Sequence, residues 1–311
     1  MPELPEVETI AQGLARRITG DIIESIWLGK KPEPLKSSPR EIAAALENAR
    51  IIAVRRMGKH IVFDLERHDG KPPQSSVALS ARSSTLPLPA HKLGRVDRQG
   101  RSSGREAKGA SARAQFIVHL GMTGRLQVCE PQAEVVKHTH AVAKLASGRE
   151  LRFIDPRRFG RLSVAGLGNF DTVGIEPLEV DLDGFIALFR GRNTPIKSAL
   201  LNQKLLRGVG NIYADESLFR ARIRPRRRAS TITREQFRKL HASIKEVLKE
   251  AIALGGSSIS DYVDANGEAG FFQLQHRVYG REDEFCLVCK TPIKRIIIAG
   301  RSSHYCPNCQ K

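Results

Sequence analysis

The sequence predicts an α+β protein: an N-terminal antiparallel β-sandwich, a helical second part and a C-terminal hairpin held by cysteines. Three observations predict this fold. Segments rich in Ile, Val, Leu and Phe fill the first half, apolar residues recur at helical spacing from about residue 181, and two Cys-x-x-Cys pairs lie near residue 300. A chain of 311 residues is long enough for two hydrophobic cores. We expect domains over 1–178, 179–276 and 277–311.

The first domain opens with a helix that Pro5 begins and Gly20 follows. Val7, Ile10 and Leu14 fall on one face of this helix, which we expect to be core. Strands are expected at seven places, in two packed sheets: 21–28, 51–56, 60–65, 115–120, 124–128, 140–145 and 150–154.

The second domain is expected to hold four helices, at 183–190, 196–202, 212–221 and 234–254. The last has the clearest ends, because Thr233 and Gln236 form a capping-box pattern and two glycines follow residue 254.

The charge of the chain indicates a polyanionic partner. Lys and Arg number 51 against 33 Asp and Glu, which gives a net charge of +18. A membrane surface is the alternative, but the sequence has no apolar run near 18 residues and no signal-like start. We therefore expect a cytoplasmic protein with no membrane partner.

Residues 67–114 fit neither domain. They carry ten Lys and Arg against three Asp and Glu, and they show no hydrophobic period. Such a composition cannot bury a core, so we expect a disordered or loosely packed basic insertion that is dispensable for chemistry.

The two Cys-x-x-Cys pairs are Cys286 with Cys289 and Cys306 with Cys309. Each pair presents two thiolates, so together they predict one tetrahedral zinc ion with a structural role. Two disulfides or free thiols are the alternative, which the cytoplasmic expectation disfavours.

The chain begins MPELPEVETI, with Pro2 and Glu3 behind the initiator Met. Loss of Met1 would leave Pro2 with a free amine, whose reference pKa of about 7.7–8.0 keeps part of it neutral and nucleophilic at neutral pH. Taken alone, the stretch more often marks an ordinary terminus before a helix.

Three further stretches suit nucleic acid, although each is more often a plain turn or a solvated surface. RGVGN at 207–211 can bring backbone N–H groups to a phosphate. DPRRFG at 155–160 places arginines beside an aromatic ring, which is what opening a base stack requires. HTH at 138–140 offers two histidines to a metal or to DNA.

Together these stretches resemble the formamidopyrimidine-DNA glycosylase family. The matching motifs are MPELPEVE at 1–8, RRMGK at 55–59, HLGMTG at 119–124, DPRRFG at 155–160, GVGNIYA at 208–214 and the closing four-cysteine finger. The resemblance covers the chain except the basic insertion. It implies a β-sandwich, a helix–two-turns–helix domain and a zinc finger.

The resemblance implies a bifunctional base excision repair enzyme that removes 8-oxoguanine and formamidopyrimidines from duplex DNA and cleaves the abasic site by β,δ-elimination. Pro2 matches the Schiff-base nucleophile and Glu3 the general acid. Lys59 matches a lysine with proton-donor and phosphate roles, and Arg301 an arginine linked to δ-elimination.

The resemblance also implies a set of DNA contacts. Met122, Arg157 and Phe159 match the group that fills the gap left by the extruded base. The remaining matched positions contact the DNA backbone: His138, Arg192, Lys197 and Asn211. The partner is double-stranded DNA with oxidised purines or abasic sites, and we expect a monomer.

Two departures from the family pattern stand out, Thr139 between the histidines and the insertion ahead of Met122. Two other functions stay open on sequence: a non-catalytic damaged-DNA-binding protein of the same fold, and a protein-interaction module built on a zinc ribbon. Neither has a need for Pro2, Glu3 and Lys59 together.

Overall fold

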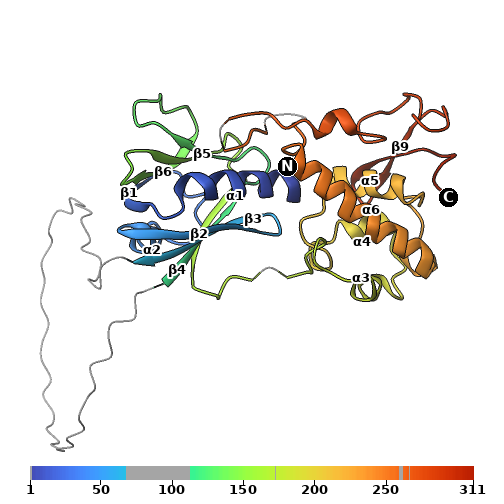
Figure 1. Ribbon diagram of the computed structural model, residues 1–311, viewed down its shortest axis with the longest axis horizontal. Helices are drawn as coiled ribbons and strands as arrows, with labels where there is room; N and C mark the ends of the chain where they lie inside the picture. The colour runs from blue at the N-terminus through green and yellow to red at the C-terminus, as the bar shows by residue number, and fades with distance from the viewer. Residues whose placement is uncertain (1, 68–112, 172, 259–261, 266) are drawn as a thin grey trace, which may run out of the picture.

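The computed structural model describes residues 2–67, 113–171, 173–258, 262–265 and 267–311. Most of the predicted basic insertion, residues 68–112, lies outside this range. Figure 1 shows a β domain and a helical domain side by side, with the described N-terminus between them. Helix α1 (Leu4–Ile18) runs from that junction back through the β domain.

The β domain holds one antiparallel sheet of eight strands in the order β5-β7-β6-β1-β2-β3-β4-β8. The strands are β1 (Ile22–Leu28), β2 (Ala49–Met57), β3 (His60–Arg67), β4 (Arg113–His119), β5 (Arg125–Cys129), β6 (Thr139–Leu145), β7 (Glu150–Ile154) and β8 (Arg161–Gly166). The predicted sandwich is therefore formed by two halves of one sheet. Strand β1 joins them, since it pairs with β2 only at Ile22 and Ile23 and then follows β6.

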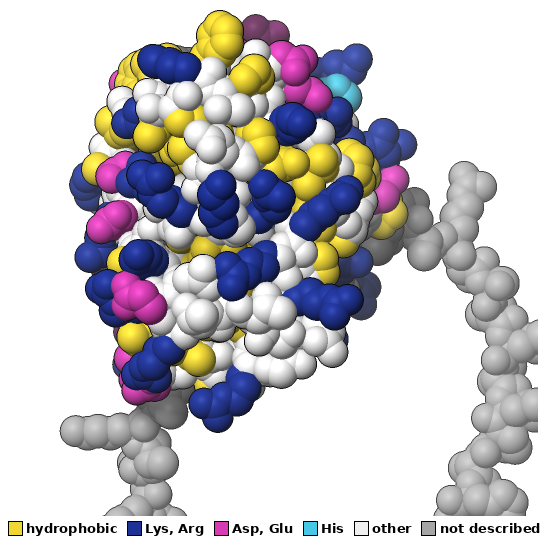
Figure 2. Space-filling model, turned by 90° about the vertical axis from the view of Figure 1, so that its right-hand side faces the viewer, with side chains coloured by type: hydrophobic (Ala, Val, Ile, Leu, Met, Phe, Trp, Pro, Cys, Tyr) yellow, Lys and Arg dark blue, Asp and Glu magenta, His cyan; other side chains and the backbone are white. Residues whose placement is uncertain are grey.

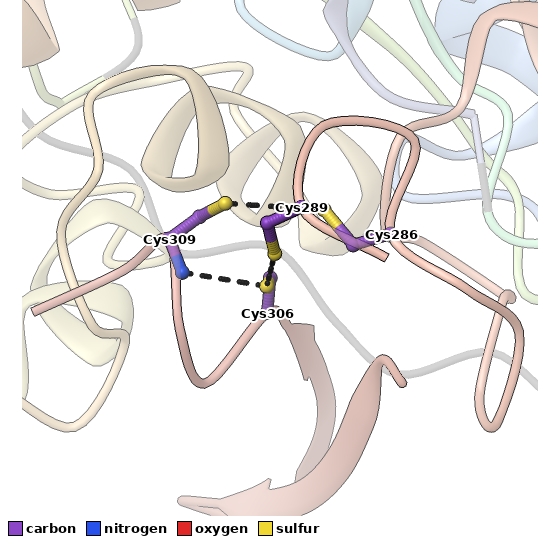
Figure 3. Close-up of side chains that lie close together, drawn as sticks. All are labelled: Cys286, Cys289, Cys306 and Cys309. Atoms are coloured by element: carbon purple, nitrogen blue, oxygen red, sulfur yellow. Dashed lines mark hydrogen bonds between the residues drawn. The ribbon is translucent and has the colours of Figure 1, made fainter. Parts of the chain in front are cut away.

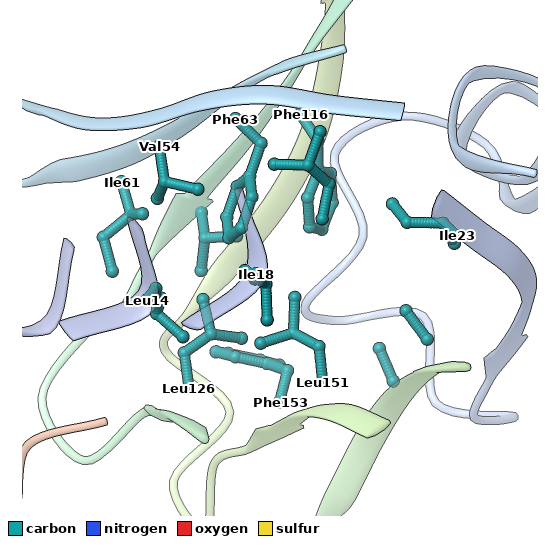
Figure 4. Close-up of a cluster of buried hydrophobic side chains, with 14 of the residues drawn as sticks. Leu14, Ile18, Ile23, Val54, Ile61, Phe63, Phe116, Leu126, Leu151 and Phe153 are labelled. Atoms are coloured by element: carbon teal, nitrogen blue, oxygen red, sulfur yellow. The ribbon is translucent and has the colours of Figure 1, made fainter. Parts of the chain in front are cut away.

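The two halves of the sheet enclose α1. Phe63 and Phe116 on one side and Leu151 and Phe153 on the other belong to a single buried cluster with the apolar face of the helix (Figure 4). This packing explains the spacing of apolar residues in α1 and confirms that the predicted face is core.

Two elements of this domain were not expected from the sequence. Helix α2 (Pro39–Leu46) is short, has three consecutive alanines and buries Ile42 and Leu46, and Ser38 and Glu41 form a capping box at its start. Strand β8 is short and ends at Gly166, and it is fixed by pairing with β4 rather than by its own pattern.

The helical domain has a second core. It contains α3 (Leu182–Phe189), α4 (Ile196–Leu200), α5 (Asn211–Arg220) and α6 (Arg234–Ala253), with short 3₁₀ turns η1 (Ala229–Thr231) and η2 (Phe272–Gln275). Leu4 is completely buried in this core, although it belongs to α1. The first turn of the chain is therefore held by the second domain.

The C-terminal segment forms a hairpin of β9 (Lys294–Ile298) and β10 (Arg301–Tyr305), next to the four cysteines. It packs against the helical domain, because β10 lies along α5. Among the described helices, none combines the length and the apolar character needed to cross a membrane.

Candidate active site

A cleft of about 590 Å³ lies where the β domain, the helical domain and the finger hairpin meet. The four predicted catalytic residues, Pro2, Glu3, Lys59 and Arg301, all line it. They come from the N-terminus, the β2–β3 turn and the start of β10, so the fold brings together residues that are far apart in the sequence.

Glu3 precedes α1 and is 4 % exposed. Its carboxylate points at the N-terminus of α5 and accepts backbone N–H bonds from Ile212 at 3.1 Å and Tyr213 at 3.5 Å. Burial raises the pKa of Glu3 to about 7, even though Lys59 and these N–H groups oppose the rise. A carboxyl group with this pKa is divided between its acid and its base at neutral pH.

Glu6 holds Glu3 in place from one turn further along α1. Its buried carboxylate accepts the backbone N–H of Glu3 at 2.8 Å, the N–H of Ser257 at 2.8 Å and the hydroxyl of Tyr213. Burial raises the pKa of Glu6 as well. The carboxylate thus joins the N-terminus, α5 and the segment after α6.

Lys59 follows a glycine at the β2–β3 turn and is 9 % exposed. Burial lowers the pKa of its ammonium group, and the charge of Glu3 opposes that change. The turn is fixed by Glu176, which accepts the N–H of Gly58 at 2.9 Å and pairs with Arg56 at 2.7 Å. Glu176 also pairs with Arg207 of the helical domain at 3.0 Å, so it links the two domains beside Lys59.

The three predicted gap-filling residues lie on two neighbouring loops. Met122 is 39 % and Phe159 47 % exposed, and the guanidinium of Arg157 lies 5.1 Å from the centre of the Phe159 ring. Buried Asp155 joins the loops, because it accepts the hydroxyl of Thr123 at 2.7 Å and also bonds N–H groups of its own loop. The two loops therefore hold the apolar side chains of Met122 and Phe159 and the cation of Arg157 close together at the surface.

The four predicted backbone contacts have different environments. His138 and Arg192 are exposed, and Asn211 lines the cleft at the first turn of α5. Lys197 is completely buried and pairs with Asp215 at 2.7 Å. A phosphate contact by Lys197 stays a prediction, and it would require the ammonium group to leave or share this carboxylate. His140 is also buried, bonded to the carbonyl of Asp155 at 2.9 Å, and is structural.

Positive charge continues over the end of the molecule formed by the helical domain. Figure 2 shows Lys and Arg side chains spread across this face, with fewer Asp and Glu among them. Four exposed arginines lie on the segment that follows α5: Arg222, Arg224, Arg226 and Arg228. Such a surface favours the approach of a polyanion.

The ligand atoms of Cys286, Cys289, Cys306 and Cys309 all lie within 4.8 Å of one another (Figure 3). Four thiolates at this spacing fit one tetrahedral zinc ion and leave no ligand position open. The site lies beyond the open end of the β9–β10 hairpin, whereas Arg301 lies at its closed end. Zinc therefore supports the hairpin and takes no part in the cleft.

Several residues of the site were not singled out from the sequence. Glu6 and Glu176 are buried acids, and Tyr213 is a buried phenol. The role of each depends on contacts between domains. Only Glu3 and Glu6 left a signal, a spacing of three residues at a helix start.

Comparison with known proteins agrees with this geometry. The chain matches family models for the formamidopyrimidine-DNA glycosylase N-terminal domain (1–162), its H2TH domain (173–263) and a zinc finger found in FPG and IleRS (283–311). It is 41 % identical to the formamidopyrimidine-DNA glycosylase of Solibacter usitatus, with full coverage of both chains.

Two solved structures of the Lactococcus lactis Fpg are each 30 % identical to the chain. One holds abasic-site DNA, with a TM-score of 0.79 and 99 % of each chain covered. The other is a point mutant of that protein with DNA containing Fapy-dG, with a TM-score of 0.80 and full coverage of both chains. Together with the cleft, these matches show that the chain belongs to the formamidopyrimidine-DNA glycosylase family, DNA repair enzymes that are both glycosylases and abasic-site lyases.

Proposed function

We propose that Pro2, freed by loss of Met1, is the nucleophile of this DNA glycosylase. Its nitrogen attacks C1′ of the damaged nucleotide, and the electron pair of the N-glycosidic bond leaves with the base. A secondary amine then gives a cationic iminium, which withdraws electrons from the sugar. The observation that carries this proposal is the cleft in which Pro2, Glu3, Lys59 and Arg301 meet.

Glu3 acts as the general acid in this proposal. It donates its proton to O4′ as the C1′–O4′ bond breaks and the iminium forms. Burial keeps the pKa of Glu3 at about 7, so a large fraction of the carboxyl group still holds its proton at neutral pH. An exposed glutamate would be almost fully deprotonated at neutral pH.

The strand is then cut in two eliminations. A base removes a C2′ proton, the electron pair of that C–H bond moves into the iminium, and the enamine so formed expels the 3′ phosphate. A second elimination expels the 5′ phosphate. In this proposal Lys59 exchanges protons and holds a phosphate, and Arg301 binds a phosphate during the second step. What supports these roles is that both residues line the cleft with Glu3. Both are cations, which suits a leaving group that carries negative charge.

The remaining residues would hold the opened DNA. Met122 and Phe159 replace the stacking of the extruded base, and Arg157 bonds the orphaned cytosine. His138, Arg192, Lys197 and Asn211 contact the backbone. We further propose that the substrates are 8-oxoguanine, formamidopyrimidines and abasic sites in duplex DNA, and that the enzyme works as a monomer in the cytoplasm, bound to the nucleoid.

The test uses a duplex with one 8-oxoguanine opposite cytosine. Strand cleavage with both β- and δ-elimination products is expected, and borohydride should trap a covalent adduct that maps to Pro2. A Pro2→Gly variant keeps a weaker primary amine and should trap slowly, whereas an acetylated terminus should not trap. Trapping at Lys59 in the unmodified protein would overturn the assignment, and binding without cleavage would favour a non-catalytic damage sensor.

A further inference from the structure

Asp215 lies at the centre of a buried polar network between α5 and the finger hairpin. One carboxylate oxygen pairs with the ammonium group of Lys197 at 2.7 Å. The other accepts a hydrogen bond from the backbone N–H of His304 at 2.9 Å. The hydroxyl of Ser303 lies at 3.4 Å. Asp215 and Lys197 are both completely inaccessible to solvent, so this is an ion pair in the interior.

Lys197 extends the network to the residue that follows Arg301. Its ammonium donates to the backbone carbonyl of Ser302 at 2.6 Å, and Asn211 donates to the hydroxyl of the same serine at 3.3 Å. Residues 302–304 of β10 are therefore each bonded to α4 or α5. Arg301 is the next residue on the strand, is itself exposed, and lines the cleft.

We propose that Asp215 is a positioning residue for Arg301: with Lys197 it anchors β10 to the helical domain and so places the guanidinium in the cleft. The zinc ion holds the far end of the hairpin, and this ion pair holds the strand next to the chemistry. This inference rests on the role proposed above for Arg301 in the second elimination.

The anchor should be sensitive to the charge of Asp215 rather than to its shape. In Asp215→Asn, the amide can offer its oxygen to Lys197 or to the N–H of His304, but not to both. Its NH₂ group then faces a donor, and the lysine loses its counter-ion in the interior. We expect β10 to loosen and Arg301 to leave its position.

The experiment compares full-length, zinc-loaded variants on abasic-site duplex DNA. Arg301→Ala defines the product pattern when the guanidinium is absent. Asp215→Asn should resemble it, with the ratio of δ- to β-elimination product reduced by about 10- to 100-fold while borohydride trapping continues. Asp183→Asn is the matched control, since it makes the same change in an exposed ion pair with Arg234 and should give the wild-type ratio.

A second variant covers the case in which Asp215→Asn does not fold. The double change Lys197→Met with Asp215→Leu replaces the ion pair by apolar side chains, which often preserves stability. It should fold and retain zinc, yet still lose δ-elimination. A wild-type product ratio in this double variant, with Arg301→Ala defective, would overturn the positioning role.

Amide hydrogen exchange tests the anchor without relying on catalysis. In both Asp215 variants the amides of 302–305 should exchange faster, and those of β3 and β4 should not. If Arg301→Ala gives normal products, the role proposed for Arg301 fails, and exchange alone decides the anchor. Unchanged exchange in β10 would refute it in every case.

Discussion

Gly210 lies directly against the carboxyl group of Glu3. A Cβ built on Gly210 would be 2.2 Å from Cδ of Glu3 and 2.4 and 2.5 Å from its two carboxylate oxygens. The backbone of Gly210 is extended (φ −129°, ψ −160°), so a side chain is excluded by the carboxylate and not by its own torsion angles. The N-terminus of α5 can thus approach Glu3 only because this residue is glycine.

Gly210→Ala should therefore impair base excision by displacing Glu3 from the N–H groups of α5. We expect a loss of about 100-fold or more in single-turnover excision of 8-oxoguanine, because the general acid is moved. Affinity for abasic-site DNA should stay close to normal. Gly29→Ala is the control, since its Cβ would meet nothing closer than 3.4 Å. Equal losses in both variants would contradict the steric explanation.

The pH dependence of excision should reflect Glu3 and the Pro2 amine together. The amine must be neutral, so the rate should rise as the pH approaches the reference pKa of an α-amino group, about 7.7–8.0. Glu3 must be protonated, so the rate should fall above its pKa of about 7. A narrow maximum between these values is expected in single-turnover rates. In Glu3→Gln the rate should drop by about 10²- to 10⁴-fold and the decline at high pH should disappear.

Glu3 should also make the folded protein less stable at high pH. Its pKa is raised from 4.5 to about 7 on folding, so the folded state binds more protons between these values. Stability should fall as the pH rises through this window, by about 3 kcal/mol for this group alone. Glu3→Gln should therefore raise the melting temperature at pH 8 more than at pH 5. Glu24→Gln, at an exposed position of β1, should show no such difference.

Removal of zinc should abolish δ-elimination, the last step of strand cleavage. Cys306→Ala or a strong chelator should release one zinc ion per chain, melt the β9–β10 hairpin and withdraw Arg301 from the cleft. Metal analysis and the ratio of elimination products check this expectation. Cys129→Ala, in β5 of the other domain, should keep both the metal and the products. Full activity in a zinc-free protein would contradict a structural role for the metal.

Thr123→Val should separate base excision from cleavage of a preformed abasic site. The hydroxyl of Thr123 bonds buried Asp155, which links the Met122 loop to the Phe159 loop. Its loss leaves Asp155 with fewer partners and should free the two loops, at a cost of about 1–3 kcal/mol. Extrusion of 8-oxoguanine should slow, whereas an abasic site needs no extruded base. Thr139→Val loses an exposed bond to the carbonyl of Val136 and should have little effect.

The sequence predicted elements with strong local patterns and missed those that depend on neighbours. Helix α6 has a capping box and a continuous apolar stripe, and its predicted bounds differ by one residue from those observed. Strand β8 has no such pattern and exists because β4 offers it an edge. The two layers of the β domain were predicted, but not that β1 joins them into one sheet, since register depends on contacts between distant segments.

The same limit applies to the site. Cysteine spacing predicted the zinc ligands, because four thiolates in two close pairs have few other uses. The resemblance to a known family supplied Pro2, Glu3, Lys59 and Arg301, and the structure places them in one cleft. The burial of individual charged side chains could not be predicted from the sequence, as Lys197 shows. Only the fold shows that its ammonium group is buried with Asp215.

The presence of Pro2 and Arg301 in one cleft has a consequence for synthesis of the protein. Pro2 is translated long before Arg301 and the zinc ligands. A chain still being translated therefore has a nucleophile without the finger and without the α5 surface that holds Glu3. A chain that lacks the finger hairpin therefore lacks Arg301 and cannot assemble the complete cleft.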